Sequence, residues 1–113
     1  MANTYYMHLQ NKYFQQIKNG QKNLELRLYD EKRRQLQCGD LIVWNNQKNN
    51  KESITTKITD FYHAENFFQL CRNIDIPQTG FNDKNELITA LDAIYPLEKQ
   101  QQYGVVAIEL ELI

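Results

Sequence analysis

The chain has 113 residues, 42% of them hydrophobic and 24% charged, which is typical of a single globular domain. Its 13 basic and 14 acidic residues give a formal net charge of −1, so overall charge does not draw the molecule to nucleic acid or to an anionic membrane. No apolar run is long enough to cross a bilayer, and no N-terminal apolar segment resembles a signal peptide. We therefore expect a soluble, cytoplasmic protein that makes no contact with membranes and needs a local patch to bind nucleic acid.

The first half of the chain is expected to contain three strands and one helix. In chain order, the pattern predicts a strand at 4–9, a helix at 11–19, a strand at 22–29, a charged connection at 30–37 and a strand at 41–44. Gly20 stands where the helix should stop. Leu24, Leu26 and Leu28 alternate with polar residues, so we expect these leucines to face the core.

The second half is expected to add two strands and two helices. The order is a polar loop at 45–53, a strand at 53–64, a helix at 65–74, a loop at 75–83, a helix at 85–95 and a strand at 103–113. Asp83 and Glu86 fit a capping box for the later helix, which Pro96 should end. The closing strand is expected to place four side chains on one face, namely Val106, Ile108, Leu110 and Leu112.

This succession of elements predicts the fold class. Strands with about three short helices indicate an α+β domain. Because the helices do not alternate regularly with the strands, a doubly wound parallel sheet is disfavoured. We expect a small mixed or antiparallel β-barrel with the helices packed around it. No repeat, low-complexity tract or linker divides the chain, so one domain over residues 1–113 is expected.

The cysteines and histidines are expected to be structural or superficial. Cys38 and Cys71 form no C-x-x-C pair, and neither His8 nor His63 lies at a metal-ligand spacing from them. We expect two buried free thiols and two histidines without a catalytic role. The sequence has no glycine-rich phosphate loop, no Ser-His-Asp order and no metal-binding cluster, so neither a cofactor nor a metal is expected.

One motif connects the first helix with the next two strands. The segment "IKNGQKNLELRL" is followed by "LQCGDLIVW", and the chain closes with "AIYPLEKQQQYGVVAIELE". The residues that carry the motif are Ile17, Gly20, Lys22, Glu25, Arg27, Gly39 and Asp40. This combination resembles the ASCH (activating signal cointegrator homology) domain, a family with a PUA-like β-barrel. The resemblance covers nearly the whole chain and implies a cleft between sheet and helices that holds RNA or a nucleotide-like ligand.

The residues of the motif are suited to such a cleft. Residues two apart in a strand project from one face about 6–7 Å from each other, so Glu25, Arg27 and Tyr29 would line one wall, next to Lys22. Arg27 offers a planar fork for phosphate or a base edge, and Glu25 could accept from an exocyclic amine. Tyr29 could stack on a base. The simpler alternative is an exposed strand face on which Glu25 and Arg27 pair with each other.

A basic segment adjoins this strand. Lys32, Arg33 and Arg34 could contact the phosphate backbone as the rim of the cleft, although Asp30 and Glu31 next to them weaken the local field. The alternative is a solvated loop. Tyr103, at the start of the closing strand, is a further candidate for ligand contact. Trp44 is expected in the core rather than in the cleft wall.

The same residues leave an enzymatic alternative open. Some small bacterial members that this chain resembles are amidohydrolases acting on acetylated cytidine, with a lysine, a threonine three residues later and a glutamate before the last helix. Lys22 matches that lysine, Glu25 stands at the threonine position, and Gly80 lies where the glutamate would be expected, with Glu86 a turn further on. Lys22 would act as catalytic base or positioning charge, with Glu25 assisting proton transfer. A ribonuclease and a protein-binding adaptor are further alternatives.

Overall fold

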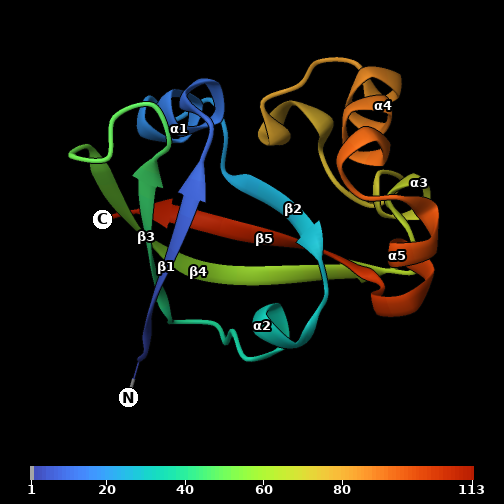
Figure 1. The fold of residues 1–113 in the computed structure, drawn as a ribbon, viewed down its shortest axis with the longest axis horizontal. Helices are drawn as coiled ribbons and strands as arrows, with labels where there is room; N and C mark the ends of the chain where they lie inside the picture. Colours follow the sequence, from blue (N-terminus) through green and yellow to red (C-terminus); the bar gives the residue numbers. More distant parts are fainter. Residues whose placement is uncertain (1) are drawn as a thin grey trace.

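Five strands form one curled sheet in the computed structural model, which describes residues 2–113 (Figure 1). The strands are β1 (Thr4–Leu9), β2 (Leu24–Leu28), β3 (Leu41–Asn46), β4 (Ser53–Ala64) and β5 (Val105–Leu112). Their spatial order is β1-β3-β4-β5-β2, with β1 and β3 parallel and every other pair antiparallel. β1 and β2 are therefore the two edges of a half-barrel that stays open between them.

The helices lie in separate places around this sheet. They are α1 (Asn11–Lys18), α2 (Glu31–Arg34), α3 (Phe67–Leu70), the 3-10 helix η1 (Ile76–Thr79), α4 (Lys84–Ile94) and α5 (Leu97–Tyr103). In Figure 1, α1 lies beside the ends of β1 and β3, whereas α3, α4 and α5 gather at the other side of the molecule. The predicted α+β fold, a small β-barrel with short helices around it, is confirmed in the form of a curled half-barrel, and three of the five α-helices in residues 2–113 have seven or more residues. None of the helices in the described chain is long and apolar enough to span a membrane.

Two hydrophobic cores pack against opposite faces of β2 and β5. The first core fills the curl of the sheet and includes Phe14, Ile17, Ile42, Trp44, Ile58, Val106 and Ile108. The second core lies under α3 and α4 and includes Leu24, Leu26, Phe67, Leu70, Leu87, Val105 and Ala107. Successive strand residues point to opposite faces, so β5 supplies both cores and must be apolar almost throughout. Trp44 lies in the first core, as predicted.

The leucines of β2 face the second core, and its charged residues face the curl of the sheet. Glu25 lies opposite Ile108 and Arg27 lies opposite Val106 in the pairing with β5. Directly opposed residues share a face of the sheet. Because Ile108 and Val106 belong to the first core, Glu25 and Arg27 project toward that core rather than onto a solvated surface.

Several local predictions are corrected. Cys38 is exposed, because it lies in the turn before β3 with its Sγ 3.6 Å from the Thr59 carbonyl, whereas Cys71 is buried as predicted. The expected charged connection contains α2, whose first turn is capped by Asp30 accepting from the Arg33 N–H. The helix expected at 65–74 is α-helical only over Phe67–Leu70, and η1 forms within the expected loop.

The end of the chain also differs from expectation. Pro96 follows the end of α4 but is also the N-cap of α5, and its carbonyl accepts from the N–H groups of Lys99 and Gln100 at 2.9 and 3.1 Å. The closing strand buries Val106, Ile108 and Leu110, while Leu112 is exposed near its end. Asp83 caps α4 by accepting from the Asn85 N–H at 2.8 Å, in agreement with half of the predicted capping box.

Candidate ligand-binding cleft

A cleft of about 210 Å³ lies along the free edge of β2, between the α1 and α4 sides of the molecule. Its lining comes from five parts of the chain: His8, Leu9, Gln10 and Tyr13; Lys22, Glu25, Leu26 and Arg27; Gln47; Thr79 and Phe81; and Leu87, Ala90, Leu91, Ile94 and Tyr95. The apolar residues come mainly from α4, and the charged residues come from β2 and from Lys22, which precedes it. The cleft is thus apolar on one side and charged on the other.

Glu25 lies between the two cations of the cleft. Its Oε1 is 3.1 Å from Lys22 Nζ, and its Oε2 is 2.9 Å from Arg27 Nη2 and accepts from Arg27 Nε at 2.9 Å. Burial alone would raise the pKa of the Glu25 carboxyl, but the charges and hydrogen bonds of Lys22 and Arg27 outweigh it, so the pKa lies below its ordinary value. Glu25 is therefore ionised at neutral pH, and the three side chains together carry one net positive charge.

Lys22 is buried, and its ammonium group has three acceptors. Besides the Glu25 carboxylate, Nζ donates to the Leu24 carbonyl at 2.7 Å and to the Thr79 carbonyl at 2.9 Å. An ammonium group has three protons and no lone pair, so these contacts use its whole donor capacity. Lys22 consequently holds the η1 segment against the start of β2, and the ring of Tyr13 lies 5.7 Å away from Nζ.

Arg27 connects the two edges of the half-barrel. Its Nη2 donates to the His8 carbonyl of β1 at 3.2 Å, and its guanidinium lies 5.8 Å from the ring of Trp44. Burial tends to lower the pKa of Arg27, but the Glu25 carboxylate raises it above its ordinary value. Within residues 2–113, Nη1 makes no hydrogen bond. Arg27 is thus the cation of the cleft with donors left to bind a ligand.

Aromatic side chains complete the cleft. The rings of Tyr13 and Phe81 stack with their centroids 6.1 Å apart. Burial raises the pKa of the Tyr95 hydroxyl above its ordinary value, although the charge of Arg27 acts in the opposite direction. Among the described residues, the Tyr95 hydroxyl has no hydrogen-bond partner. It can therefore donate to or accept from a ligand.

The other residues predicted for the site lie outside the cleft. Arg34 covers the ring of Tyr29 at 4.2 Å and donates to the Tyr103 carbonyl at 3.0 Å, while the Tyr29 ring also lies 4.5 Å from that of His63. Arg33 pairs with Asp30 at 3.1 Å, and Lys32 is exposed. None of these residues lines the cleft, and neither does Glu86, which is exposed. The structure brings together Lys22, Glu25 and Arg27 of the predicted set.

Sequence reasoning assigned only Lys22, Glu25 and Arg27 of the lining residues to the cleft. The residues that it missed include His8, Tyr13, Thr79, Phe81 and Tyr95. His8 was expected to be structural or superficial, and Tyr95 was expected only in the apolar stripe of its helix. They reach the cleft through tertiary packing, for which a local pattern gives no signal.

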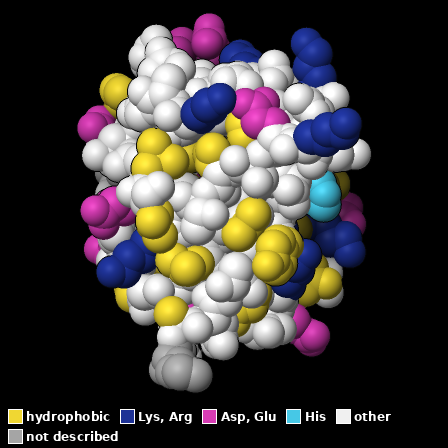
Figure 2. Space-filling view, turned by 90° about the vertical axis from the view of Figure 1, so that its left-hand side faces the viewer, with side chains coloured by type: hydrophobic (Ala, Val, Ile, Leu, Met, Phe, Trp, Pro, Cys, Tyr) yellow, Lys and Arg dark blue, Asp and Glu magenta, His cyan; other side chains and the backbone are white. Residues whose placement is uncertain are grey.

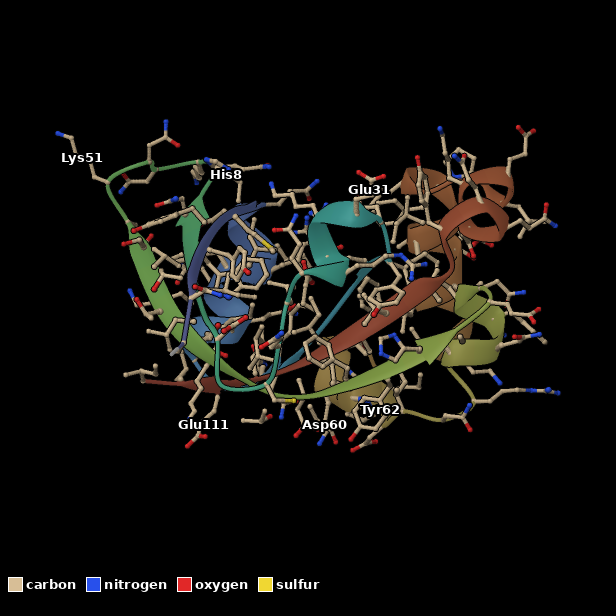
Figure 3. The ribbon with its side chains drawn as sticks, turned by 90° about the horizontal axis from the view of Figure 1, so that it is seen from below. His8, Glu31, Lys51, Asp60, Tyr62 and Glu111 are labelled. Carbon is tan, nitrogen blue, oxygen red and sulfur yellow. The ribbon has the colours of Figure 1, made fainter. Side chains whose placement is uncertain are left out.

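In Figure 3, His8 lies on the side of the molecule opposite Asp60 and Tyr62, so the Tyr62–Glu109 hydrogen bond of 3.2 Å is remote from the cleft. The described residues contain no cluster of three side chains suited to a metal ion.

A curled α+β half-barrel of this kind is the fold of a small PUA-like domain. Residues 7–113 match the model of the ASCH domain, and the chain belongs to this family, which is associated with RNA binding. A comparison with proteins of curated function found no match.

The chain is similar to several solved structures. The hypothetical protein PH0355 is 34% identical, with a TM-score of 0.85 over 97% of this chain and 99% of that one. Protein PF0455 from Pyrococcus furiosus is 31% identical, with a TM-score of 0.76 over 97% of each chain. An ASCH domain from Lactobacillus crispatus is 16% identical, with a TM-score of 0.69 over 96% of this chain and 79% of that one, and this likeness supports the fold alone.

Proposed function

We propose that the cleft binds a nucleotide of single-stranded RNA, or a nucleotide-like ligand, through Arg27. The observation that carries this proposal is the partly satisfied guanidinium of Arg27 on the charged side of the cleft, which faces the apolar side chains of α4. Glu25 fixes the orientation of the guanidinium through Nε and Nη2, which leaves Nη1 for a phosphate or a base edge. Tyr13, Phe81 and Tyr95 provide the aromatic surface on which bases stack in single-strand binding proteins.

The amidohydrolase alternative gains no support from the contacts of Lys22. A catalytic base needs a lone pair, and the ammonium of Lys22 has each of its three protons directed to an acceptor. The carboxylate of Glu25 is likewise engaged by both cations. These two residues form a fixed electrostatic frame for the cleft, and Arg27 is left as the group that contacts the ligand.

The test compares two substitutions that remove the same charge at different places. Arg27→Gln should weaken binding of a short single-stranded RNA by about tenfold or more, because a charge-assisted hydrogen bond contributes about 1.5–3 kcal/mol. Lys32→Gln removes an exposed positive charge outside the cleft and should leave affinity within about threefold. Fluorescence anisotropy at fixed low salt measures both affinities, and circular dichroism establishes that each variant is folded.

The two variants also decide between the cleft and α2 as the RNA contact. Equal affinity of Arg27→Gln and wild type would refute a role of the cleft. A larger loss for Lys32→Gln than for Arg27→Gln would instead assign the RNA contact to α2.

A further inference from the structure

The peptide N–H and C=O groups of β2 point alternately toward β5 and toward the cleft. At its two ends, the Leu110 N–H donates to the Asn23 carbonyl at 2.8 Å and the Tyr29 N–H donates to the Gly104 carbonyl at 3.0 Å. In an antiparallel pair, residues that bond to the partner alternate with residues whose N–H and C=O point away. Asn23 and Tyr29 are odd-numbered, so the backbone of Leu24, Leu26 and Leu28 faces the free edge.

Leu26 has the free peptide groups at the cleft. The Leu24 carbonyl already accepts from Lys22 Nζ at 2.7 Å, as expected for a group that points to the free edge. The register with β5 turns the N–H and C=O of Leu26 away from that strand, and no loop or side chain in residues 2–113 bonds to them, although the residue is only 4% exposed. Buried backbone groups without a partner are rare in proteins. The unpaired peptide groups of Leu26 therefore indicate a place for a ligand or water.

The cleft lies where these groups point. Glu25 and Arg27 project from one face of β2 and Leu26 projects from the other, yet all three line the same cleft. A single cavity can contact both faces of a strand only along its free edge. That edge is where the N–H and C=O of Leu26 emerge, side by side.

We propose that these two groups hydrogen-bond to the Watson–Crick edge of an unpaired nucleobase, an inference that rests on the proposed function. A ligand can bond to both groups of Leu26 when its planar edge carries an acceptor next to a donor. Adenine offers N1 and its N6 amino group, and uracil offers O4 and N3–H. The apolar side chains of Leu87, Leu91 and Ile94 border the same space, and Arg27 Nη1 remains for the ribose or phosphate.

An added peptide strand fits this edge less well than a base. Strand addition needs a run of free backbone groups along the edge. Here the Leu24 carbonyl is occupied by Lys22, and of the three edge-facing residues only Leu26 lines the cleft. A single free residue suits a small planar group. A base that uses this edge cannot at the same time be paired, so the cleft selects single-stranded nucleotides.

The experiment compares nucleotide analogues altered at one edge of the base. Calorimetry would measure binding of adenosine 5′-monophosphate, its 1-deaza analogue and its 7-deaza analogue, together with uridine 5′-monophosphate, its N3-methyl derivative and its C5-methyl derivative. The 1-deaza and N3-methyl changes alter the Watson–Crick edge and should weaken binding by about tenfold. The 7-deaza and C5-methyl changes lie at another edge and should leave affinity within about twofold.

A change in the protein completes the test. An ester at the bond between Glu25 and Leu26 removes the Leu26 N–H and keeps every side chain. It should weaken binding of adenosine 5′-monophosphate but not that of the 1-deaza analogue. Parent nucleotides that bind as well as their Watson–Crick analogues would overturn the inference and leave the proposed function standing. If none of the six nucleotides binds to the unmodified protein, both the inference and the proposed function are overturned.

Discussion

Glu25 is the residue on which the geometry of the cleft depends. Its two carboxylate oxygens hold Lys22 on one side and Arg27 on the other, and those cations in turn hold η1 and β1. The carboxylate is buried, so water does not replace it when it is lost. Removing one member of a buried ionic group costs far more than removing a surface ion pair, because the remaining charges stay buried without compensation.

Substitution Glu25→Gln should therefore lower the free energy of unfolding by about 3 kcal/mol, because two buried cations lose their common counter-ion. Urea denaturation at neutral pH would measure the change. Glu65→Gln is the matched control, because Glu65 is exposed, and it should change stability by about 0.5 kcal/mol or less. A similarly small change in the free energy of unfolding for both variants would mean that Glu25 does not stabilise the two buried cations.

The same residue predicts how stability depends on pH. The pKa of Glu25 in the folded protein lies below its ordinary value of 4.5, so the unfolded chain takes up the proton first as the pH falls. The stabilisation is therefore complete above about pH 5 and is lost as the pH falls through 4.5 toward the folded-state pKa. Urea denaturation from about pH 7 to pH 3 should show a flatter acid limb for Glu25→Gln. Parallel curves for the variant and wild type would contradict this expectation.

At the scale of elements, a glycine fixes the approach of η1 to α1. Gly80 ends η1 with φ of +89°, and a Cβ there would overlap Gln16 Oε1 of α1. The Gln16 amide also donates to the Gly80 carbonyl at 3.1 Å. Because Thr79 and Phe81 flank this glycine, the contact positions one side of the cleft.

Gly80→Ala should consequently destabilise the fold more than Gly20→Ala. Gly20 has nearly the same φ, +87°, but a Cβ there would meet nothing within 4 Å. Gly20→Ala measures only the backbone cost of about 1 kcal/mol. Gly80→Ala should cost about 2 kcal/mol, because the added Cβ moves the Gln16 amide away from the Gly80 carbonyl and a hydrogen bond worth about 1 kcal/mol is lost. Thermal or urea unfolding would give both values. Equal losses of stability in the two variants would show that the contact with Gln16 does not contribute to the free energy of unfolding.

The comparison of sequence and structure is clearest at β2. The alternation of leucines and charged residues gave the two faces correctly, because a period of two is a local property of the chain. It did not reveal that the charged face is buried as well, because the curl of the sheet turns Glu25 and Arg27 toward the first core. Tyr13 and Phe81 meet only through tertiary packing, and Cys38 is exposed because a turn places it outward. None of these three outcomes leaves a periodic signal in the chain.

At the scale of the whole molecule, the 13 basic and 14 acidic residues nearly balance. Figure 2 shows a face on which Lys and Arg side chains are scattered among Asp and Glu rather than gathered into one patch. This agrees with a net charge of −1 for the chain. The proposed RNA contact consequently relies on the single net positive charge of the cleft and not on a broad basic surface.

The salt dependence of RNA binding should reflect this limited contact. Each phosphate contact on a single strand contributes about −0.7 to the slope of the logarithm of affinity against the logarithm of salt concentration. One or two contacts predict a slope of about −1, which a titration from about 20 to 200 mM salt would measure. A slope of about −3 or steeper would require several cations and would place the binding surface outside the cleft.

The order of the strands also has a consequence for folding during synthesis on the ribosome. β2, which carries the charged residues of the cleft, pairs only with β5, and β5 follows it after residues 29–104 have been made. On a ribosome that adds about 5–20 residues per second, the nascent β2 waits several seconds for its partner. During that time Lys22, Glu25 and Arg27 remain hydrated. The cleft is thus completed only when β5 leaves the exit tunnel and inserts between β4 and β2.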